Sequence, residues 1–396
     1  MLNHRLLSAP KEPKKFVPTA VEFIQKHAKN KKVFCALSGG IDSSATYLLL
    51  KKAGVNVLPV FIDHGLMRII RGREEREYVK ELFPDVKVVD IRKEFLPKIF
   101  GEGDAEIKRK LFKKAYSETF DKIIDEENCD LLADGTILPD LEESFGVEIT
   151  DLKETMSTEE EIDLRKAQKG RGFVKSQHNV EIEYAVEATL QPVASLTKDE
   201  VRQLLKFLDM PDELVYRKAF PGPALAARIV GAVNEDNLGL EKEVHDIVES
   251  QVNDFYTKKH GKSMIINEKG AQEPFQVFAA VLQDVDKAKV TGILDGNRTY
   301  RGIKVIKDDW DYQQLTALGK QVKDYSRVFY LLEKSNDGTY DVVIRSVNSI
   351  DARTATVTNL PIDLLKEITE KIITKPEVKN VYFDVTPKPP GTIEYV

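Results

Sequence analysis

The residues LSGGIDSS, at positions 37–44, combine small and hydroxyl-bearing side chains in a way that suits the binding of an anion. They follow the apolar run KVFCAL at 32–37 and precede a segment of helical character at 42–52, so they form a turn between a strand and a helix. Glycines let the backbone come close to a ligand, and a helix begins with free N–H groups and a positive dipole end. The turn can therefore cradle a phosphate. The residues predicted to do so are Ser38, Gly39, Gly40, Ser43 and Ser44.

The same turn can be interpreted as an ordinary strand–helix connection with a good helix cap. Three hydroxyls and two glycines are more than such a turn needs, so phosphate binding is preferred. The turn is not a P-loop, because no lysine follows the second glycine, and it is not G-x-G-x-x-G. Asp42, beside the turn, is either a ligand of Mg²⁺, direct or through water, or a carboxylate that complements the helix dipole.

Short apolar runs alternate with helical segments around this turn. Strands are expected at 32–37, 55–62, 86–91 and 130–133, and helices at 42–52, 72–82 and 105–126. This alternation is typical of an α/β fold with a doubly wound parallel sheet, in which ligands bind at the carboxyl ends of the strands. Further along, Thr197 and Glu200 predict a capping box that starts an amphipathic helix over 197–208.

Two stretches divide the rest of the chain. Residues 146–172 are charged and nearly free of large apolar groups, which predicts a lid insertion, and AFPGPALAAR at 219–228 is a Pro/Gly-rich joint. We therefore expect an N-terminal extension (1–20), an α/β domain (21–218) and a smaller α+β domain (219–396). In the last of these, strands are expected at 275–282, 300–306, 328–332, 340–347 and 380–385, and helices at 240–256 and 361–373.

The composition describes a globular chain with balanced charge. Its 396 residues carry 59 Lys and Arg against 65 Asp and Glu, a net charge of −6, whereas nucleic-acid binders usually have a basic excess. Two cysteines, Cys35 and Cys129, are too few for a disulfide scaffold or a multi-cysteine metal site. No apolar run reaches the roughly 18 residues that span a membrane, and no secretory signal is visible. We expect a cytoplasmic protein with no membrane and no nucleic-acid partner.

SGGIDSS, at 38–44, resembles the PP-loop S-G-G-x-D-S of the N-type ATP pyrophosphatases. Further segments are similar, in the same order, to those of GMP synthetase, a member of that superfamily. They are FIDHGLMR at 61–68, ADGTILPDLEES at 133–144, KSQHNV at 175–180, QPVASLTKDEV at 191–201, YRKAFPGPALAAR at 216–228 and KPPGTIEYV at 388–396. The resemblance covers the chain from about residue 20 onward. It implies an adenine nucleotide alpha hydrolase-like sheet followed by an α+β dimerisation domain that binds XMP.

The resemblance also implies a reaction and its site. An oxygen of XMP attacks the α-phosphate of ATP, pyrophosphate leaves, and ammonia displaces AMP from the adenylyl-XMP intermediate to give GMP; ATP and Mg²⁺ are the implied cofactors. Catalysis is assigned to Asp42, Ser43 and Lys175, with Asp42 as the metal ligand. ATP and pyrophosphate are expected to bind at Ser38, Gly39, Gly40, Asp42, Ser43, Ser44, Ile62 and Gly135. XMP is expected at Arg228, Lys388, Thr392, Ile393 and Glu394, with His178 and Asn179 in the lid.

The source of ammonia is expected to lie outside the chain. A glutaminase needs a nucleophilic cysteine with a histidine partner, and neither Cys35 nor Cys129 lies in such a context. The chain is similar to the synthetase half of the two-subunit archaeal GMP synthases, which implies a separate glutamine amidotransferase subunit as partner. It also implies a homodimer.

Some positions depart from the pattern of the family. Asp134 replaces its glutamine, KSQHNVEIEYA lacks one histidine and a Gly-Gly pair, and the tail ends in Tyr-Val. These changes leave open a paralogue that adenylates a different nucleotide or a tRNA acceptor. A tRNA thiolase, however, would need catalytic or metal-binding cysteines and a basic surface. A non-catalytic nucleotide sensor would be expected to have a spoiled phosphate loop, whereas residues 38–44 are intact.

Overall fold

The computed structural model describes residues 3–145, 155–157, 186–263, 265–266, 272–273, 275–307, 309–322, 324–335, 337–349 and 354–396. The chain forms two compact units and passes between them more than once. Unit 1 comprises Met1–Asp63, Arg76–Ile91 and Lys114–Arg217, and unit 2 comprises His64–Glu75, Arg92–Lys113 and Lys218–Val396.

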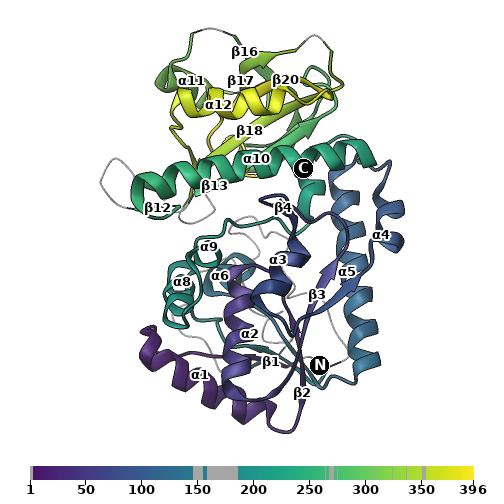
Figure 1. Ribbon diagram of the computed structural model, residues 1–396, viewed down its shortest axis with the longest axis vertical. Coiled ribbons are helices and arrows are strands. Elements are labelled where there is room, and N and C mark those ends of the chain that lie inside the picture. Colours follow the sequence, from purple (N-terminus) through teal and green to yellow (C-terminus); the bar gives the residue numbers. More distant parts are fainter. Residues whose placement is uncertain are drawn as a thin grey trace. The chain divides into compact units, whose positions relative to one another are not determined.

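A seven-stranded sheet forms the centre of unit 1, with the strand order β6-β3-β2-β7-β9-β1-β8 (Figure 1). The six strands from β6 to β1 are parallel, and β8 is antiparallel to β1 at the edge. The predicted parallel α/β sheet is therefore confirmed. Its strands are β1 (Asn3–Leu6), β2 (Lys32–Ala36), β3 (Asn56–Asp63), β6 (Lys87–Asp90), β7 (Leu131–Ala133), β8 (Thr155–Ser157) and β9 (Ala188–Gln191).

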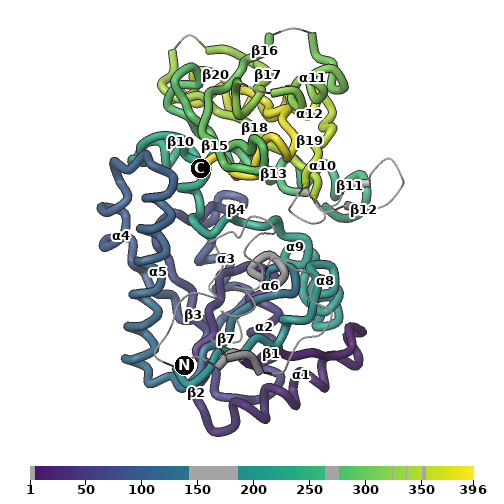
Figure 2. Tube along the Cα trace, turned by 180° about the vertical axis from the view of Figure 1, so that it is seen from behind, coloured from purple at the N-terminus to yellow at the C-terminus, as the bar shows by residue number. Residues whose placement is uncertain are grey.

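Helices cover both faces of this sheet. α1, α2 and α8 pack together on one side, and the C-terminal half of α5 lies on the other (Figure 1 and Figure 2). Phe34 of β2 and Ile62 of β3 turn toward α5, where Phe120 meets Phe34 with ring centroids 4.9 Å apart. The helices are α1 (Pro13–Ala28), α2 (Ile41–Ala53), α3 (Glu75–Leu82), α5 (Ala105–Glu127), α6 (Leu138–Phe145), α8 (Lys198–Phe207) and α9 (Asp212–Val215).

Local signals fix where these helices begin and end. Gly54 takes the left-handed conformation (φ 68°) at the end of α2, and its N–H donates to the carbonyl of Lys51. The predicted capping box is present at α8: the Thr197 hydroxyl accepts from the Glu200 N–H, and the Glu200 carboxylate accepts from the Thr197 N–H at 2.8 Å. Across the described part of the chain, no helix has the length and apolar character that crossing a membrane requires.

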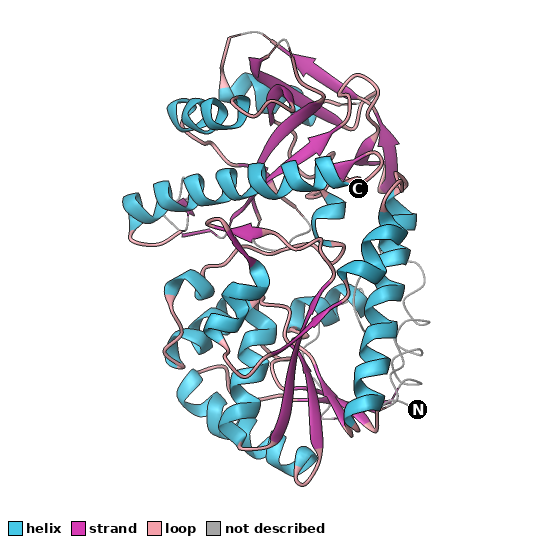
Figure 3. Ribbon diagram, turned by 45° about the vertical axis from the view of Figure 1, so that its right-hand side comes forward, coloured by secondary structure: helices cyan, strands magenta, loops and turns pink. Residues whose placement is uncertain are grey.

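The main sheet of unit 2 is mixed, with the order β10-β13-β18-β20-β17-β16 and β19 paired to β18. One face is covered by α10, which packs against β13, together with α11 and α12 (Figure 3). The α+β architecture predicted for this part is confirmed. The strands of this sheet are β10 (Ile229–Val230), β13 (Phe275–Leu282), β16 (Ile303–Ile306), β17 (Arg327–Lys334), β18 (Tyr340–Asn348), β19 (Thr356–Val357) and β20 (Val378–Asp384).

Smaller elements complete unit 2. The helices are α4 (Arg92–Ile99), α10 (Glu235–His260), α11 (Tyr312–Lys320), α12 (Ile362–Ile373) and the 3-10 turn Ala224–Ala227. The short strand pairs are β4 (Ile69–Ile70) with β5 (Arg73–Glu74), β11 (Ile265–Ile266) with β12 (Gln272–Glu273), and β14 (Val290–Leu294) with β15 (Asn297–Arg301).

The C-terminal tail, residues 388–396, packs on the sheet face opposite α10. The Tyr395 ring makes edge contacts with Phe278 and Phe329, at centroid distances of 6.1 and 5.9 Å. Its hydroxyl donates to Asp384 Oδ2 at 2.8 Å. The tail thus packs on apolar side chains of the sheet and also reaches the buried carboxylate of Asp384.

Asp384 lies in the core of unit 2 between two arginines. Its Oδ2 is 3.1 Å from Nη1 of Arg327 and 3.1 Å from Nη1 of Arg345, and all three side chains are 0% exposed. Burial, with the neighbouring Arg345 charge as the next cause, lowers the pKa of Arg327 to about 10. The carboxylate is thus the charged partner that lets two guanidinium groups lie inside the fold.

Two predicted elements differ from the structure. The strand expected at 300–306 is two strands, Asn297–Arg301 and Ile303–Ile306, separated at Gly302. The helix expected at 72–82 begins at Glu75, because the preceding residues form the β4–β5 turn with Arg71 and Gly72 in the left-handed region.

The predicted three-part division at residues 20 and 218 stays a prediction. The compact units follow a different course along the chain, since His64–Glu75 and Arg92–Lys113 belong to unit 2. Residues of the expected N-terminal extension form β1 and most of the first two turns of α1. Apart from β8, the expected lid at 146–172 lies outside the described residues.

Replacing Asp384 by Asn should destabilise the protein, because two buried guanidinium groups lose their carboxylate. We expect the free energy of unfolding to fall by about 3–5 kcal/mol, measured by urea denaturation monitored by circular dichroism. Asp337→Asn, on an exposed turn of the same unit, is the control and should change stability by less than about 0.5 kcal/mol. Equal stability of the two variants would show that Asp384 is not needed to bury the arginines.

Candidate functional site

The serine–glycine turn of unit 1 is open at the first turn of α2. Gly39 has φ 78°, a left-handed conformation that favours glycine, and Gly40 is the N-cap residue of α2. Gly40, at the N-cap, has no side chain that could cap the helix, and among the described residues only the Gly40 N–H itself donates to a side chain, to Ser38 Oγ at 3.4 Å. This distinguishes the turn from an ordinary capped connection and suits an anion at the helix N-terminus.

The three hydroxyls of the turn have different surroundings. Ser38 is exposed, and its Oγ lies 3.1 Å from Oγ of Ser43. Ser43 also donates to the Gly40 carbonyl at 3.1 Å. Ser44 is fully buried and donates to the same carbonyl at 2.8 Å. Ser38 therefore carries the exposed hydroxyl of the turn, with the buried Ser43 beside it, whereas Ser44 braces the turn from within.

Gly135, just beyond the end of β7, packs directly on the first turn of α2. A Cβ at this position would lie 2.6 Å from the Ser43 nitrogen and 2.7 Å from the Asp42 carbonyl carbon, both backbone atoms. Only glycine fits there without moving the helix. The backbone after β7 thus supports the turn from the side.

Asp134, which replaces the glutamine of the family pattern, is buried, and both of its carboxylate oxygens accept hydrogen bonds. Its Oδ1 accepts from the Thr136 N–H at 3.0 Å, and its Oδ2 accepts from Gln191 Nε2 at 3.4 Å. Its backbone carbonyl accepts from the Thr46 hydroxyl at 3.2 Å. The substitution therefore organises the loop after β7 and links it to α2.

Asp42 forms an ion pair with Lys198 through Oδ2. Its other oxygen, Oδ1, is buried and has no hydrogen-bond partner within the described residues. An unpartnered carboxylate oxygen at the edge of a phosphate-binding turn suits a hard cation such as Mg²⁺. The residues present therefore fit the metal that the sequence predicts.

Two cationic residues near the turn were not predicted. Lys198, the first residue of α8, pairs with Asp42, and Arg217 donates to the Gly39 carbonyl. The Arg217 guanidinium also lies over the Tyr78 ring, 5.0 Å from its centroid. Both lie in segments that carry the family resemblance, QPVASLTKDEV and YRKAFPGPALAAR. Their contacts join residues more than 150 positions apart, which no local pattern reveals.

The remaining predicted residues of this site are Ile62, Lys175, His178 and Asn179. Ile62 is buried in β3, and its side chain packs in the core facing α5, so only its backbone can serve a ligand. Lys175, His178 and Asn179 lie outside the described residues.

In unit 2, Arg228 and Glu394, which were both predicted to bind XMP, contact each other. Arg228 is 0% exposed, and its Nε and Nη2 lie 3.2 and 3.3 Å from the two oxygens of Glu394. The Arg228 guanidinium stacks on the Phe278 ring at 4.1 Å. Gln276 donates to Glu394 Oε1 at 3.2 Å. Glu394 is thus held in a defined place by Arg228 and Gln276, which lie outside the tail.

The other predicted tail residues are held by the fold. The Thr392 hydroxyl accepts from Arg327 Nη2 at 2.6 Å, and Ile393 packs against the core beneath the tail. Lys388 is nearly buried, and its N–H and C=O pair with Ala355 at 2.8 and 2.9 Å. Of the predicted XMP residues, the structure brings Arg228 and Glu394 into contact and turns Thr392 toward Arg327.

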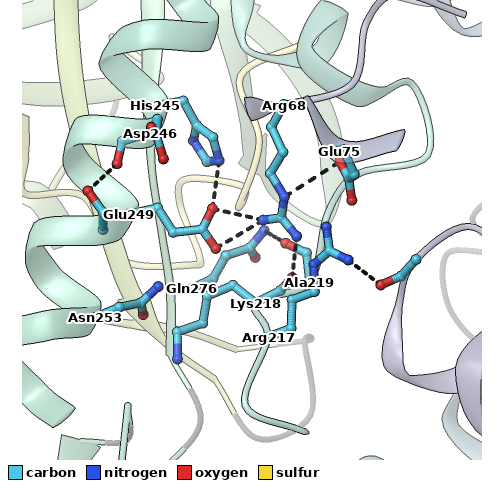
Figure 4. Close-up of polar contacts among 12 residues, drawn as sticks. Arg68, Glu75, Arg217, Lys218, Ala219, His245, Asp246, Glu249, Asn253 and Gln276 are labelled. Carbon is cyan, nitrogen blue, oxygen red and sulfur yellow. Dashed lines mark hydrogen bonds and ion pairs between the residues drawn. The ribbon is translucent and has the colours of Figure 1, made fainter. Parts of the chain in front are cut away.

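A chain of polar contacts that joins Arg68, Glu249 and His245 was not predicted either (Figure 4). Arg68 Nη1 lies 3.0 and 2.8 Å from the two oxygens of Glu249, and Glu249 Oε2 lies 2.9 Å from His245 Nε2. His245 Nδ1 in turn lies 3.2 Å from Arg228 Nη1. Burial and the Arg228 charge lower the pKa of His245 to about 4. Only Arg68 had a sequence signal, its place in FIDHGLMR.

Both cysteines are buried. Cys35 lies in β2 and Cys129 just before β7, and burial raises the pKa of both thiols. A reactive cysteine needs a lowered pKa and access. The expectation that neither is a glutaminase nucleophile agrees with these positions.

Replacing Gly135 by Ala should push the first turn of α2 aside. We expect the free energy of unfolding to fall by about 1–3 kcal/mol and the affinity for inorganic pyrophosphate to fall by at least about tenfold, measured by urea denaturation and by calorimetry. Gly239→Ala is the control, because Gly239 is exposed within α10 and has no atom within 4 Å of the added carbon. Unchanged pyrophosphate binding in Gly135→Ala would contradict a role for this turn.

Comparison with known proteins places these sites in context. Residues 331–395 match the family described as GMP synthase C terminal domain, and residues 31–97 match the tRNA methyl transferase HUP domain. Among solved structures, NMN synthetase from Francisella tularensis aligns over 65% of this chain and 89% of its own, at 16% identity and a TM-score of 0.35, which is too low to carry an argument.

Relatives match over the full length of the chain. The B subunit of the glutamine-hydrolyzing GMP synthase from Methanocaldococcus jannaschii is 34% identical over 97% of this chain and 99% of its own. The protein of the same name from Methanopyrus kandleri is 32% identical with the same coverage. The resemblance predicted from the motifs is confirmed: the chain belongs to the family of GMP synthase B subunits.

Proposed function

We propose that this chain carries out the synthetase reaction of its family, the ATP-dependent amination of XMP to GMP with release of AMP and pyrophosphate. The observation that supports this best is the full-length similarity to the B subunits, combined with an uncapped serine–glycine turn at the carboxyl end of β2. An oxygen of XMP attacks the α-phosphorus of ATP, and ammonia then displaces AMP from the adenylylated intermediate.

The turn of unit 1 would hold the pyrophosphate as it leaves. The amides at the start of α2 and the exposed Ser38 hydroxyl would donate to the pyrophosphate, with Ser43 next to Ser38 at 3.1 Å. Arg217 fixes the Gly39 peptide through its carbonyl, so the donors are preorganised before the charge develops. Positioning of this kind, with charge neutralisation, supplies most of the rate in such transfers.

Asp42 would hold Mg²⁺ through its unpartnered Oδ1. The ion, when bound, neutralises phosphate charge. Lys198 occupies Oδ2 of the same carboxylate and keeps it oriented. Lys175, expected to complete the phosphate site from the lid, stays a prediction.

Glu394, Arg228 and Lys388 would bind XMP in unit 2. A carboxylate held like that of Glu394 can accept hydrogen bonds from base N–H groups, and a lysine such as Lys388 suits the phosphate. The roles expected of Thr392 and Ile393 are more modest. Their contacts shape the tail that presents Glu394.

Ammonia would come from a separate glutamine amidotransferase subunit. The relatives are named as one subunit of a glutamine-hydrolysing enzyme, and both cysteines here are buried. The homodimer and the cytoplasmic location expected from the sequence stay predictions. A paralogue acting on another nucleotide or on tRNA is the competing proposal, and the identity of the acceptor separates the two.

The decisive experiment incubates the purified chain with ATP, Mg²⁺, XMP and ammonium at alkaline pH and quantifies nucleotides by chromatography. We expect AMP and GMP in equal amounts, and no GMP when glutamine replaces ammonium. AMP release that does not depend on XMP, or ATP binding without AMP release, would overturn XMP as the acceptor.

Replacing Asp42 by Asn should remove the charge that attracts Mg²⁺ while keeping the side-chain size. We expect the rate of XMP-dependent AMP release to fall by about 100-fold or more and the Mg²⁺ concentration for half-maximal rate to rise. Asp199→Asn is the control, since Asp199 is exposed and paired only locally to Arg202, and its rate should stay within about twofold. A wild-type Mg²⁺ dependence in Asp42→Asn would remove Asp42 as the metal ligand.

A further inference from the structure

One face of α10 carries polar residues at every fourth position, next to the apolar residues with which the helix packs against the sheet. The i, i+4 spacing stacks these side chains one above another. Most of them have clear partners: Asn237 donates to the Ala232 carbonyl at 2.8 Å, and Asn253 accepts from Ser263 at 2.5 Å. The polar stripe consists of Asn237, Glu241, His245, Glu249 and Asn253.

Glu241 is the exception in this stripe. Its side chain is 0% exposed, and neither carboxylate oxygen has a hydrogen-bond partner within the described residues. One turn further along the same face, His245 touches Arg228, and Arg228 in turn holds Glu394. A buried ionised carboxylate without a partner would cost several kcal/mol, which favours the protonated form of Glu241 in this arrangement. Burial, with Glu394 adding to it and Arg228 opposing it, raises the pKa of Glu241 well above its ordinary value.

We propose that Glu241 is a positioning residue that takes over Arg228 when the nucleotide occupies Glu394. In the structure Arg228 pairs with Glu394, and Glu241 stays neutral. When Glu394 accepts the N–H groups of the base, Arg228 turns to Glu241, which loses its proton to solvent. The guanidinium thus keeps a carboxylate partner in both states. The inference rests on the proposed function, because Glu394 is the residue expected to bind XMP.

The charges around Glu241 set the sign of the effect. The charges of Arg228 and Glu394, in other parts of unit 2, act on the pKa of Glu241 in opposite directions, and His245 and Glu249 follow on its own helix. His245 is neutral above about pH 5, since its pKa is lowered to about 4. Nucleotide binding would therefore release a proton from Glu241, and a binding step that releases a proton becomes more favourable as the pH rises.

The test compares proton release on XMP binding in three proteins. Calorimetry in pairs of buffers with different ionisation enthalpies, between pH 6.5 and 8.5, gives the protons released and the affinity for the wild type, Glu241→Gln and Glu243→Gln. Glu243 is the matched control: it lies on the same helix, its side chain is 54% exposed, and it pairs with Lys375. Protons released by XMP itself are the same in all three experiments, so a difference between variants in the number of protons released comes from the protein.

We expect the wild type and Glu243→Gln to release up to about one proton more than Glu241→Gln. Their affinity for XMP should rise with pH more steeply than that of Glu241→Gln, by up to about tenfold per pH unit. If Glu241→Gln folds poorly by urea denaturation, Glu241→Met, which fills the site without a titrating group, should give the same loss. Equal proton release in all variants would overturn the inference alone. A wild-type protein that does not bind XMP would overturn the proposed function with it.

Discussion

The contact of Asp384 with Arg327 and Arg345 decides how the C-terminal tail can lie. The three buried groups carry one negative and two positive charges, so the excess positive charge must be solvated by the protein itself. The tail provides this solvation: Arg327 donates to the Glu394 carbonyl at 2.9 Å, and Arg345 donates to the Thr392 carbonyl at 2.8 Å. Buried guanidinium groups therefore fix the backbone of Thr392 and Glu394, two of the residues expected to bind XMP. We therefore interpret the main role of the cluster as positioning the tail backbone, and its contribution to net stability as secondary.

The two units build their candidate sites by different means. Unit 1 presents backbone N–H groups and hydroxyls at a helix start, and its precision comes from glycines that permit close approach, Gly39 by conformation and Gly135 by size. Unit 2 presents side chains, Arg228 and Glu394, whose precision comes from burial and ion pairing. Among the described residues, the buried carboxylate oxygens without a hydrogen-bond partner include Oδ1 of Asp42 in unit 1 and both oxygens of Glu241 in unit 2. We propose a cation for each of them, Mg²⁺ at Asp42 and the Arg228 guanidinium at Glu241.

The sequence predicted best what local physics determines. The period of apolar residues located β2, β3, β7 and α2, and the Thr197–Glu200 pair located the start of α8 to the residue. The family motifs at 216–228 and 388–396 predicted Arg228 and Glu394 as site residues, but they did not predict the contact between them. The charged partners Lys198, Arg217 and Glu249 were missed, because an ion pair depends on which distant elements meet and leaves no periodic trace. Strands β1 and β9 were missed for a related reason, since each is only four residues long and gains its stability from pairing.

The course of the chain through unit 2 bears on how this protein can be cut or recombined. Lys108, from the first half of the sequence, donates to the carbonyls of Ile229 and Gly231 at 2.7 and 2.8 Å, and the Leu225 N–H donates to the Leu66 carbonyl at 3.0 Å. A ribosome that has made only the first half has therefore exposed segments whose partners do not yet exist. A truncated chain that ends before these partners would leave Lys108 without these acceptors and the neighbouring apolar side chains uncovered. A chimera of two homologues joined at the Pro/Gly-rich joint would therefore combine mismatched partners within unit 2. To avoid this, residues His64–Glu75 and Arg92–Lys113 would have to come from the same homologue as the C-terminal half.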